Sequence, residues 1–291
     1  MKNLAKTLIF AGLILSMSSC GDSEAEYKYT QYYTNSYAIV TDIKTGEQSV
    51  SNSVVVKSEI NVNKGIIYID MSGLKVNGNS YPQISLLNLL WTSSNTWGVA
   101  ENTYPNALLS TNFPVDVTNF KYRWTDRMNM PAVDNQYANP YIMTFNFELE
   151  QQYKVAGGNM PFTFWGTTSS ATAGQEPFIS KVNPLIAIPD FENMTVSIVV
   201  CNSQFADRMP SMDIQLNKIP MTIIDEGKSF EFSIAELIPE LDNVPVPDYP
   251  CSNISGVITP GESMTLTFDC NVRRMMTYTV STTATVFGYM Q

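Results

Sequence analysis

The chain has 291 residues, with 17 basic and 27 acidic side chains and no histidine, and its formal net charge at pH 7 is −10. An acidic chain without clustered lysine or arginine is a poor partner for nucleic acid, because phosphate backbones are bound mainly through such clusters. The lack of an imidazole excludes Ser-His-Asp and Cys-His nucleophiles and His-ligated zinc sites.

Carboxylate chemistry needs no imidazole, so the glycosidase mechanism is the hydrolase mechanism that composition leaves open. It requires two acidic side chains facing each other across a cleft. Acidic side chains of β-rich proteins, however, mostly lie on solvated faces and turns. The sequence therefore predicts a protein that is not an enzyme and has no cofactor.

The first 19 residues have the form of a signal peptide. Lys2 and Lys6 bracket a basic region, and the apolar segment that follows it, residues 8–17, is too short to cross a bilayer as a helix. The segment runs into Met17-Ser18-Ser19-Cys20, which resembles a bacterial lipobox except that Met17 stands where leucine is usual. The resemblance implies cleavage before Cys20, which would become the acylated N-terminus.

The residues after the cleavage site are acidic and read Gly21-Asp22-Ser23-Glu24-Ala25-Glu26. This run is similar to the surface-export tether of Bacteroidota outer-membrane lipoproteins. The similarity implies attachment to the outer membrane through acyl chains such as palmitate, with display at the cell surface. We expect residues 20–35 to form the tether, and loss of residues 1–19 removes two lysines and takes the formal charge from −10 to −12.

Short apolar runs separated by turn residues follow the tether. Helical periodicity is hardly visible, and Asn77-Gly78 is a strong signal for a tight turn. We therefore predict a first β-domain over residues 36–166. Its strands are expected around the β-branched and apolar runs at 38–40, 54–56, 66–69 and 84–90.

One alternating stretch occurs twice in the chain. Residues 143–149 read MTFNFEL and residues 264–270 read MTLTFDC. Both alternate apolar and polar side chains, as expected of a strand with one buried face. The buried faces are predicted to consist of Met143, Phe145, Phe147 and Leu149 in the first copy and Met264, Leu266, Phe268 and Cys270 in the second.

Weaker matches accompany this repeat. Two of them precede it in the same order, and a third is a closing segment that follows each copy. The matches indicate an all-β protein of two tandem, internally duplicated domains, each a β-sandwich or a calycin-like barrel. The paired segments are 66–71 with 194–200, 82–86 with 210–214, and 162–166 with 284–288.

The division between the two domains is predicted from composition. Residues 167–177 are rich in Thr, Ser, Ala and Gly, which is typical of a linker or a long surface loop. The second β-domain is then expected over residues 178–291. Within it, Ser233 and Glu236 have the spacing of a capping box and predict a short helix.

Three cysteines lie in the second domain, in a chain exported to a compartment that permits disulfides. A hairpin centred on Pro260-Gly261 sets Cys251 opposite Cys270, so we predict a disulfide between them and a free Cys201. The same register places Ile254 and Ile258 on the face opposite Met264, Leu266 and Phe268. A bulge or a one-residue shift is therefore expected in this hairpin.

Four aromatic side chains are candidates for stacking against sugar rings: Trp91, Trp97, Tyr122 and Trp124. The alternative is that they belong to the core, as aromatic residues on one strand face usually do. Methionine is also frequent, with Met128 and Met130 in a loop and Met275-Met276 near the last strand. Thioethers can bind Cu(I), but without regular spacing they are predicted to fill the core, and no metal site is expected.

The sequence thus predicts a non-enzymatic, lipid-anchored binding module, with a glycan as the first ligand class. Two alternatives remain open. A structural or assembly subunit of the fimbrial type would pair with a protein partner through its repeated sheet edges. A barrel that binds a small ligand is the other alternative, although the Gly-x-Trp motif of lipocalins is missing from the first strand.

Overall fold

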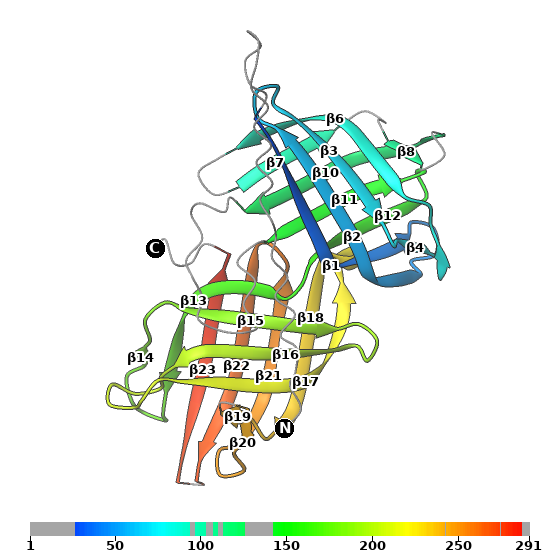
Figure 1. Ribbon diagram of the computed structural model, residues 1–291. Coiled ribbons are helices and arrows are strands. Elements are labelled where there is room, and N and C mark those ends of the chain that lie inside the picture. The colour runs from blue at the N-terminus through cyan, green and yellow to red at the C-terminus, as the bar shows by residue number, and fades with distance from the viewer. Residues whose placement is uncertain are drawn as a thin grey trace, which may run out of the picture.

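The computed structural model describes residues 27–93, 97–102, 107–109, 113–125, 142–241, 243–273 and 275–286. These residues form an all-β protein with two curled sheets, one above the other in Figure 1. No helix among them is long and apolar enough to cross a membrane. The predicted signal peptide, Cys20, Met128 and Met130 lie outside the described residues.

The first sheet closes into an eight-stranded barrel. Its strands pair in the order in which they follow along the chain, each antiparallel to the next, and the last strand pairs with the first. The barrel strands are β1 (Lys28–Asp42), β2 (Gln48–Asn61), β3 (Ile66–Ser72), β6 (Ile84–Ser93), β7 (Trp97–Asn102), β10 (Val117–Thr125), β11 (Met143–Leu149) and β12 (Tyr153–Asn159).

The second sheet closes in the same way. Again the eight main strands pair in chain order, and the last returns to the first. They are β13 (Phe162–Ala171), β15 (Asn183–Asp190), β16 (Thr195–Ser203), β17 (Met212–Ile224), β18 (Ser229–Leu237), β21 (Cys251–Thr259), β22 (Ser263–Val272) and β23 (Met276–Thr285). Of the two architectures that the sequence allowed, the structure has the barrel.

Short elements fill the connections. The Asn77-Gly78 turn joins β4 (Lys75–Val76) to β5 (Asn79–Ser80), and both turn residues have positive φ, as predicted for a tight hairpin. Two further pairs extend the fourth strand of each barrel: β8 (Ala107–Leu109) with β9 (Pro114–Val115), and β19 (Glu240–Leu241) with β20 (Val244–Pro245). The remaining elements are β14 (Phe178–Ile179) and the single turn η2 (Asp225–Gly227).

The two barrels also carry bulges at corresponding places. In the fourth strands, Asn88 and Lys218 have positive φ where the pairing with β3 and β16 shifts. In the sixth strands, Asn119 and Asn253 do the same. The repeated stretches at 143–149 and 264–270 are both seventh strands, so the shared topology has the form that an internal duplication would give.

The predicted core faces of these seventh strands are confirmed. All eight side chains named for them are buried, and each barrel has its own apolar interior. The match between residues 162–166 and 284–288, by contrast, does not join corresponding strands, because residues 162–166 lie in β13, the first strand of the second barrel.

The strand pairing also divides the chain at a different place from the predicted linker. β13 extends into the predicted linker as far as Ala171 and pairs with β23 and β15, so the first barrel ends at Asn159. Thr168 and Ser170 face inward there, where Thr168 hydrogen-bonds Thr282 at 3.1 Å. Small hydroxyl residues thus serve as strand residues here. β1 likewise begins at Lys28, inside the segment that is predicted to be tether.

The predicted helix at Ser233–Glu236 is wrong. These residues belong to β18, which pairs with β17 and β21. Phe230 and Phe232 alternate into the core with Ser229, Glu231 and Ser233 between them, and burying that apolar face stabilises a strand more than one capping interaction stabilises a short helix.

β1 joins the two barrels because both of its faces are buried near its end. Ala38 and Val40 belong to the core of the first barrel, whereas Tyr37 and Ile39 belong to the core of the second. The unbroken apolar run at 38–40 has this physical cause. Only Met160 and Pro161 separate β12 from β13, and the Met160 N–H donates to the carbonyl of Asn35 at 2.8 Å.

Candidate functional site

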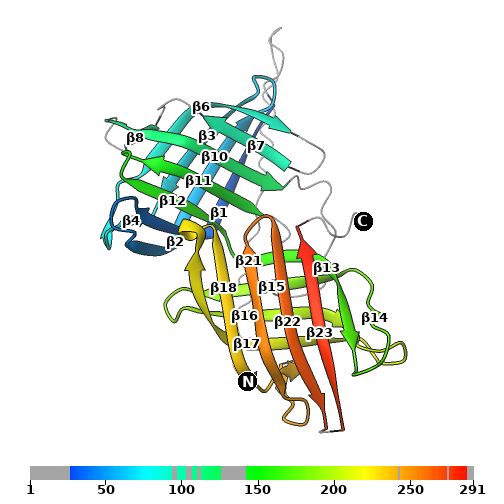
Figure 2. The same ribbon diagram turned by 180° about the vertical axis from the view of Figure 1, so that it is seen from behind.

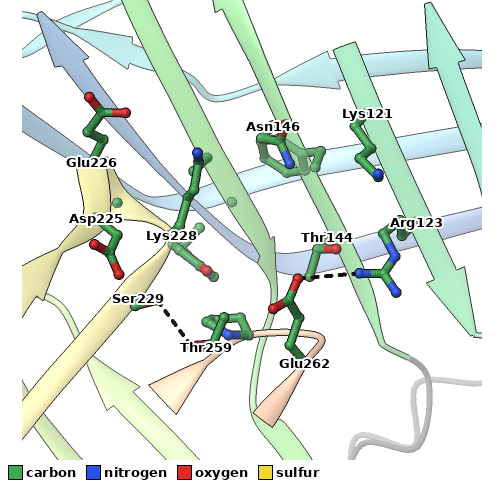
Figure 3. Close-up of a pocket in the computed structure, with 16 residues that line it drawn as sticks. Lys121, Arg123, Thr144, Asn146, Asp225, Glu226, Lys228, Ser229, Thr259 and Glu262 are labelled. Carbon is green, nitrogen blue, oxygen red and sulfur yellow. Dashed lines mark hydrogen bonds and ion pairs between the residues drawn. The ribbon is translucent and has the colours of Figure 1, made fainter. Parts of the chain in front are cut away.

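A polar cleft of about 810 Å³ lies where the two barrels meet. The first barrel contributes side chains of β10 and β11, and the second contributes the turn at η2 and the β21–β22 turn (Figure 3). Its lining carries both charges, the basic residues Lys121, Arg123 and Lys228 and the acidic residues Asp225, Glu226 and Glu262. The cleft therefore suits a hydrophilic ligand rather than an apolar one.

Ion pairs and one close contact hold the barrels together around this cleft. Lys154 Nζ lies 2.7 Å from Glu226 Oε1, and Arg123 Nη1 lies 3.6 Å from Glu262 Oε1. Gly227, with φ +92°, lies so close to the first barrel that a Cβ atom there would be 2.7 Å from Ile39 Cγ2. The turn at η2 therefore fits against β1 only because residue 227 has no side chain.

An aromatic cluster closes the near end of the second barrel. Tyr37 of β1 stacks on Phe191 with a ring-centroid distance of 4.9 Å, and it meets Phe162 and Phe230 edge to face at 5.7 and 5.8 Å. Tyr37 is only 2% exposed, and burial raises the pKa of its hydroxyl. A residue of the first barrel thus caps the interior of the second.

The opposite end of the second barrel contains an apolar pocket of about 330 Å³. Residues of β19, β22 and β23 contribute to its lining. The β22–β23 hairpin and the β19–β20 pair lie at the end of this barrel that is remote from the first barrel (Figure 1). Among the described residues that line it, none carries a formal charge. The lining is made of Phe205, Ala206, Met209, Pro210, Met212, Ile214, Pro239, Leu241, Tyr249, Cys251, Cys270, Val272, Met276 and Tyr278.

The segment between β16 and β17 covers part of this pocket. Phe205 packs edge to face on Phe268 at 6.1 Å, and Ser170 Oγ donates a hydrogen bond to the Phe205 carbonyl at 2.9 Å. Gln204 Nε2 donates to the Met209 carbonyl at 2.7 Å. The covering segment is therefore held by its own hydrogen bonds, which keeps the pocket formed without a ligand.

Three exposed apolar residues are direct neighbours of residues that line the pocket. Ile238 precedes the lining residue Pro239, Val244 pairs with the lining residue Leu241, and Met275 precedes Met276. Their exposed fractions are 53%, 61% and 74%. Apolar residues gathered at one end of a soluble protein commonly mark a contact surface.

The two cysteines of the pocket lie directly opposite each other, as the register predicted, and the expected bulge intervenes between Ser252 and Ser255. Asn271 N–H donates to the Pro250 carbonyl, so the neighbouring pair is hydrogen-bonded and Cys251 and Cys270 form a non-hydrogen-bonded pair. Cys251, Cys270 and the buried Cys201 are all free thiols in the structure, and the bridge between Cys251 and Cys270 stays a prediction.

The environment of the thiols differs between the two sites. Cys201 lies in a small separate cluster with Ile186 and Val199, and burial raises its pKa to about 12. At the opposed pair, the hydrogen bond between the thiols raises the pKa of Cys251 and lowers that of Cys270. Cys251 therefore binds its proton more tightly than Cys270 does.

Three of the four aromatic candidates form an internal cluster and not a surface platform. Tyr122 and Trp124 are core residues of the first barrel with ring centroids 5.3 Å apart, and Trp91 packs on Trp124 at 5.9 Å from a half-buried position. Trp97 begins β7, but its side chain lies outside the described residues. Burial of Tyr122 and Trp124 removes the physical basis for stacking on a sugar.

Sequence reasoning missed the pocket because its lining is assembled from distant segments. Met212 and Ile214 come from β17, Met209 from the covering segment and Met276 from β23. The signal that was available is the register of the β21–β22 hairpin, which places Cys251 opposite Cys270 at one end of the sheet.

No family model and no curated protein matches this chain. A search of solved structures finds a similarity to a double mutant of the vaccine antigen transferrin binding protein B from Haemophilus parasuis, with 7% sequence identity and a TM-score of 0.25. The match covers 88% of this chain and 76% of that chain. At a TM-score this low, the similarity carries no argument about function.

Proposed function

We propose that this chain is a non-catalytic, lipid-anchored binding protein of the outer membrane that holds a small apolar ligand in the second barrel. The observation that carries the proposal is the uncharged pocket of about 330 Å³ at the far end of that barrel. Eight-stranded barrels are wide enough to hold one small ligand, and ligand pockets are typically apolar and about 300–1,000 Å³ in volume.

Two further features support an apolar ligand. The near end of the barrel is filled by Tyr37 and the phenylalanines around it, whereas the far end keeps its volume. The exposed Ile238, Val244 and Met275 extend the apolar character of the pocket to the surface. The sequence predicted a glycan as the first ligand class and a small-ligand barrel as an alternative. The present proposal places the small ligand first and the glycan second.

Binding of the uncharged fluorescent probe N-phenylnaphthylamine tests the proposal. We expect saturable binding to the purified chain with one site. Ala206→Trp places an indole in the pocket and should weaken binding at least about tenfold, which corresponds to about 1.4 kcal/mol.

The matched control is Ala235→Trp, which adds the same ring on β18, away from the pocket. It should bind the probe as the unaltered chain does. Equal affinity of both variants, or no saturable binding at all, would show that the pocket is not a ligand site.

The lipid anchor is supported by the sequence alone. Cys20→Ala should leave an unprocessed precursor or release the protein from the membrane fraction. Retention of this variant in membranes would contradict the anchor, and protease treatment of intact cells tests display at the surface.

A glycan is the second candidate, now at the cleft between the barrels. The observation in its favour is a volume of about 810 Å³ lined by amide, hydroxyl and charged side chains such as Asn146, Thr144 and Lys228. A glycan array with Asn146→Ala, beside Lys64→Ala as a control outside the cleft, tests it. An identical array profile for both variants would count against the cleft.

Assembly by strand addition has less support. Barrel closure pairs both edges of the long strands in the described part of the chain. The edges left for a partner strand belong to short elements such as β9 and β20.

A further inference from the structure

Two thiols face each other directly in the apolar pocket at the far end of the second barrel. Cys251 and Cys270 are 0% and 5% exposed, and both belong to the lining of this pocket. As a non-hydrogen-bonded antiparallel pair they have Cα atoms about 4.5 Å apart, the closest approach that a β-ladder gives to facing side chains. Two sulfur atoms are therefore held within reach of one ion.

Thioethers converge on the same pocket from three other segments. Met209, Met212 and Met276 all belong to its lining. The backbone N–H of Phe205 lies 3.4 Å from Met209 Sδ, which fixes the position of that sulfur. Two thiols and three thioethers thus surround one cavity.

We propose that this pocket binds a soft monovalent metal ion, Cu(I), between the Sγ atoms of Cys251 and Cys270, with methionine thioethers as supporting ligands. Thiolate and thioether sulfur select soft ions such as Cu(I), whereas the harder ions prefer sites with nitrogen or oxygen ligands. This inference goes beyond the proposed binding of an apolar ligand and concerns a different chemistry in the same pocket.

Charge balance agrees with a monovalent ion. None of the lining residues carries a formal charge, so one thiolate and one Cu(I) leave the pocket neutral, which is what an apolar site favours. Binding replaces the S–H bond of one cysteine with an S–Cu bond and releases one proton to solvent, with no change in oxidation state.

The remaining ligands of common metal sites are not gathered in the described ranges. No group of three His, Cys, Asp or Glu side chains there is arranged to hold a metal ion. A site in this pocket therefore depends on methionine as well as cysteine, which is why sequence spacing did not indicate it.

Competition with the chromophoric Cu(I) chelator bicinchoninate, under argon and with the mature chain reduced, tests the proposal. We expect the chain to withdraw one equivalent of Cu(I) from the chelator complex. Cys251→Ser and Cys270→Ser should each lower the affinity at least about hundredfold, and Met209→Leu with Met212→Leu should lower it severalfold.

The matched control is Cys201→Ser, which removes a buried thiol outside the pocket and should leave Cu(I) binding unchanged. Loss of binding with Cys201→Ser, or its persistence in the Cys251→Ser/Cys270→Ser double variant, would overturn the assignment. The circular dichroism of each variant shows whether it is folded.

Two further measurements use the unaltered chain and so do not depend on whether a variant folds. X-ray absorption at the copper edge should show sulfur neighbours alone, and nitrogen or oxygen in the first shell would overturn the proposal. Thiol trapping of protein taken directly from cells, followed by peptide mapping, should recover Cys251 and Cys270 unlinked. A disulfide between them in that sample would show that the pair is a bridge and not a metal site.

Discussion

At the scale of single residues, the contact between Gly227 and Ile39 shows how the barrels are fitted together. A Cβ atom on residue 227 would come within 2.7 Å of Ile39 Cγ2, in a backbone conformation with φ +92°. Gly174 has a similar φ of +78°, but a Cβ atom added there would have no neighbouring atom within 4 Å. Both glycines have a left-handed backbone, but only Gly227 is in close contact with Ile39. A comparison of the two therefore separates the cost of backbone strain from the cost of that contact.

Alanine substitutions at these glycines should therefore have different effects on the free energy of unfolding. Gly174→Ala should lower it by about 1–2 kcal/mol, the cost of a left-handed residue with a side chain. Gly227→Ala should lower it by about 1–3 kcal/mol more, because β1 or η2 must move. Urea denaturation measures both, and equal losses would show that the barrels can separate at this point without cost.

At the scale of elements, the bulges in the fourth strands place different residues in the same left-handed conformation. The first barrel has Asn88 there, with φ +54°, and the second has Lys218, with φ +57°. Asparagine tolerates this conformation better than other residues that carry a side chain, and β-branched residues tolerate it least. Replacing Lys218 with asparagine, the residue at the corresponding position of the first barrel, should therefore stabilise the second barrel.

We expect Lys218→Asn to raise the free energy of unfolding by up to about 1 kcal/mol and Lys218→Val to lower it by about 1–2 kcal/mol. Both substitutions remove the ammonium group that interacts with Asp190, so the loss of charge cancels in their comparison. Thermal unfolding of the two variants measures the difference. Equal stability would mean that the bulge relaxes when residue 218 changes.

Prediction from sequence was reliable for elements whose signal is local. Alternation identified the buried faces of β11 and β22, and the hairpin register placed Cys251 opposite Cys270. It failed where a local signal competed with pairing between distant strands. Residues 167–171 have the composition of a linker and the capping-box residues have the spacing of a helix, yet both segments are strands because neighbouring strands bond to them.

At the scale of the whole molecule, the two barrels are joined through side chains of β1 that belong to the core of the second barrel. Tyr37 belongs to the first barrel by pairing and to the second by packing. No periodicity in the sequence could have indicated this, because the partners Phe162, Phe191 and Phe230 are distant in the chain. The apolar pocket could not be predicted from the sequence either, because the residues that line it come together only when the barrel closes.

Tyr37→Ala should lower the free energy of unfolding by about 3–5 kcal/mol, as expected for deletion of a buried aromatic ring. It should also split or broaden a single calorimetric transition, because the two cores lose their shared residue. Tyr32→Ala is the control on the same strand, where the ring is 60% exposed, and should change stability by no more than about 0.5 kcal/mol. Similar effects of the two substitutions would show that the barrels unfold independently.

The position of the start of β1 has a consequence for how the molecule would stand on a membrane. β1 begins at the end of the first barrel that is remote from the second, while the β22–β23 hairpin, which contributes to the lining of the apolar pocket, lies at the opposite end of the molecule (Figures 1 and 2). Cys20, where we propose the acyl chain, precedes β1 by only a few residues in the sequence. An anchor there would place the first barrel next to the membrane and the pocket at the end of the molecule farthest from it. The pocket could then exchange its ligand with the surroundings and not with the membrane lipids.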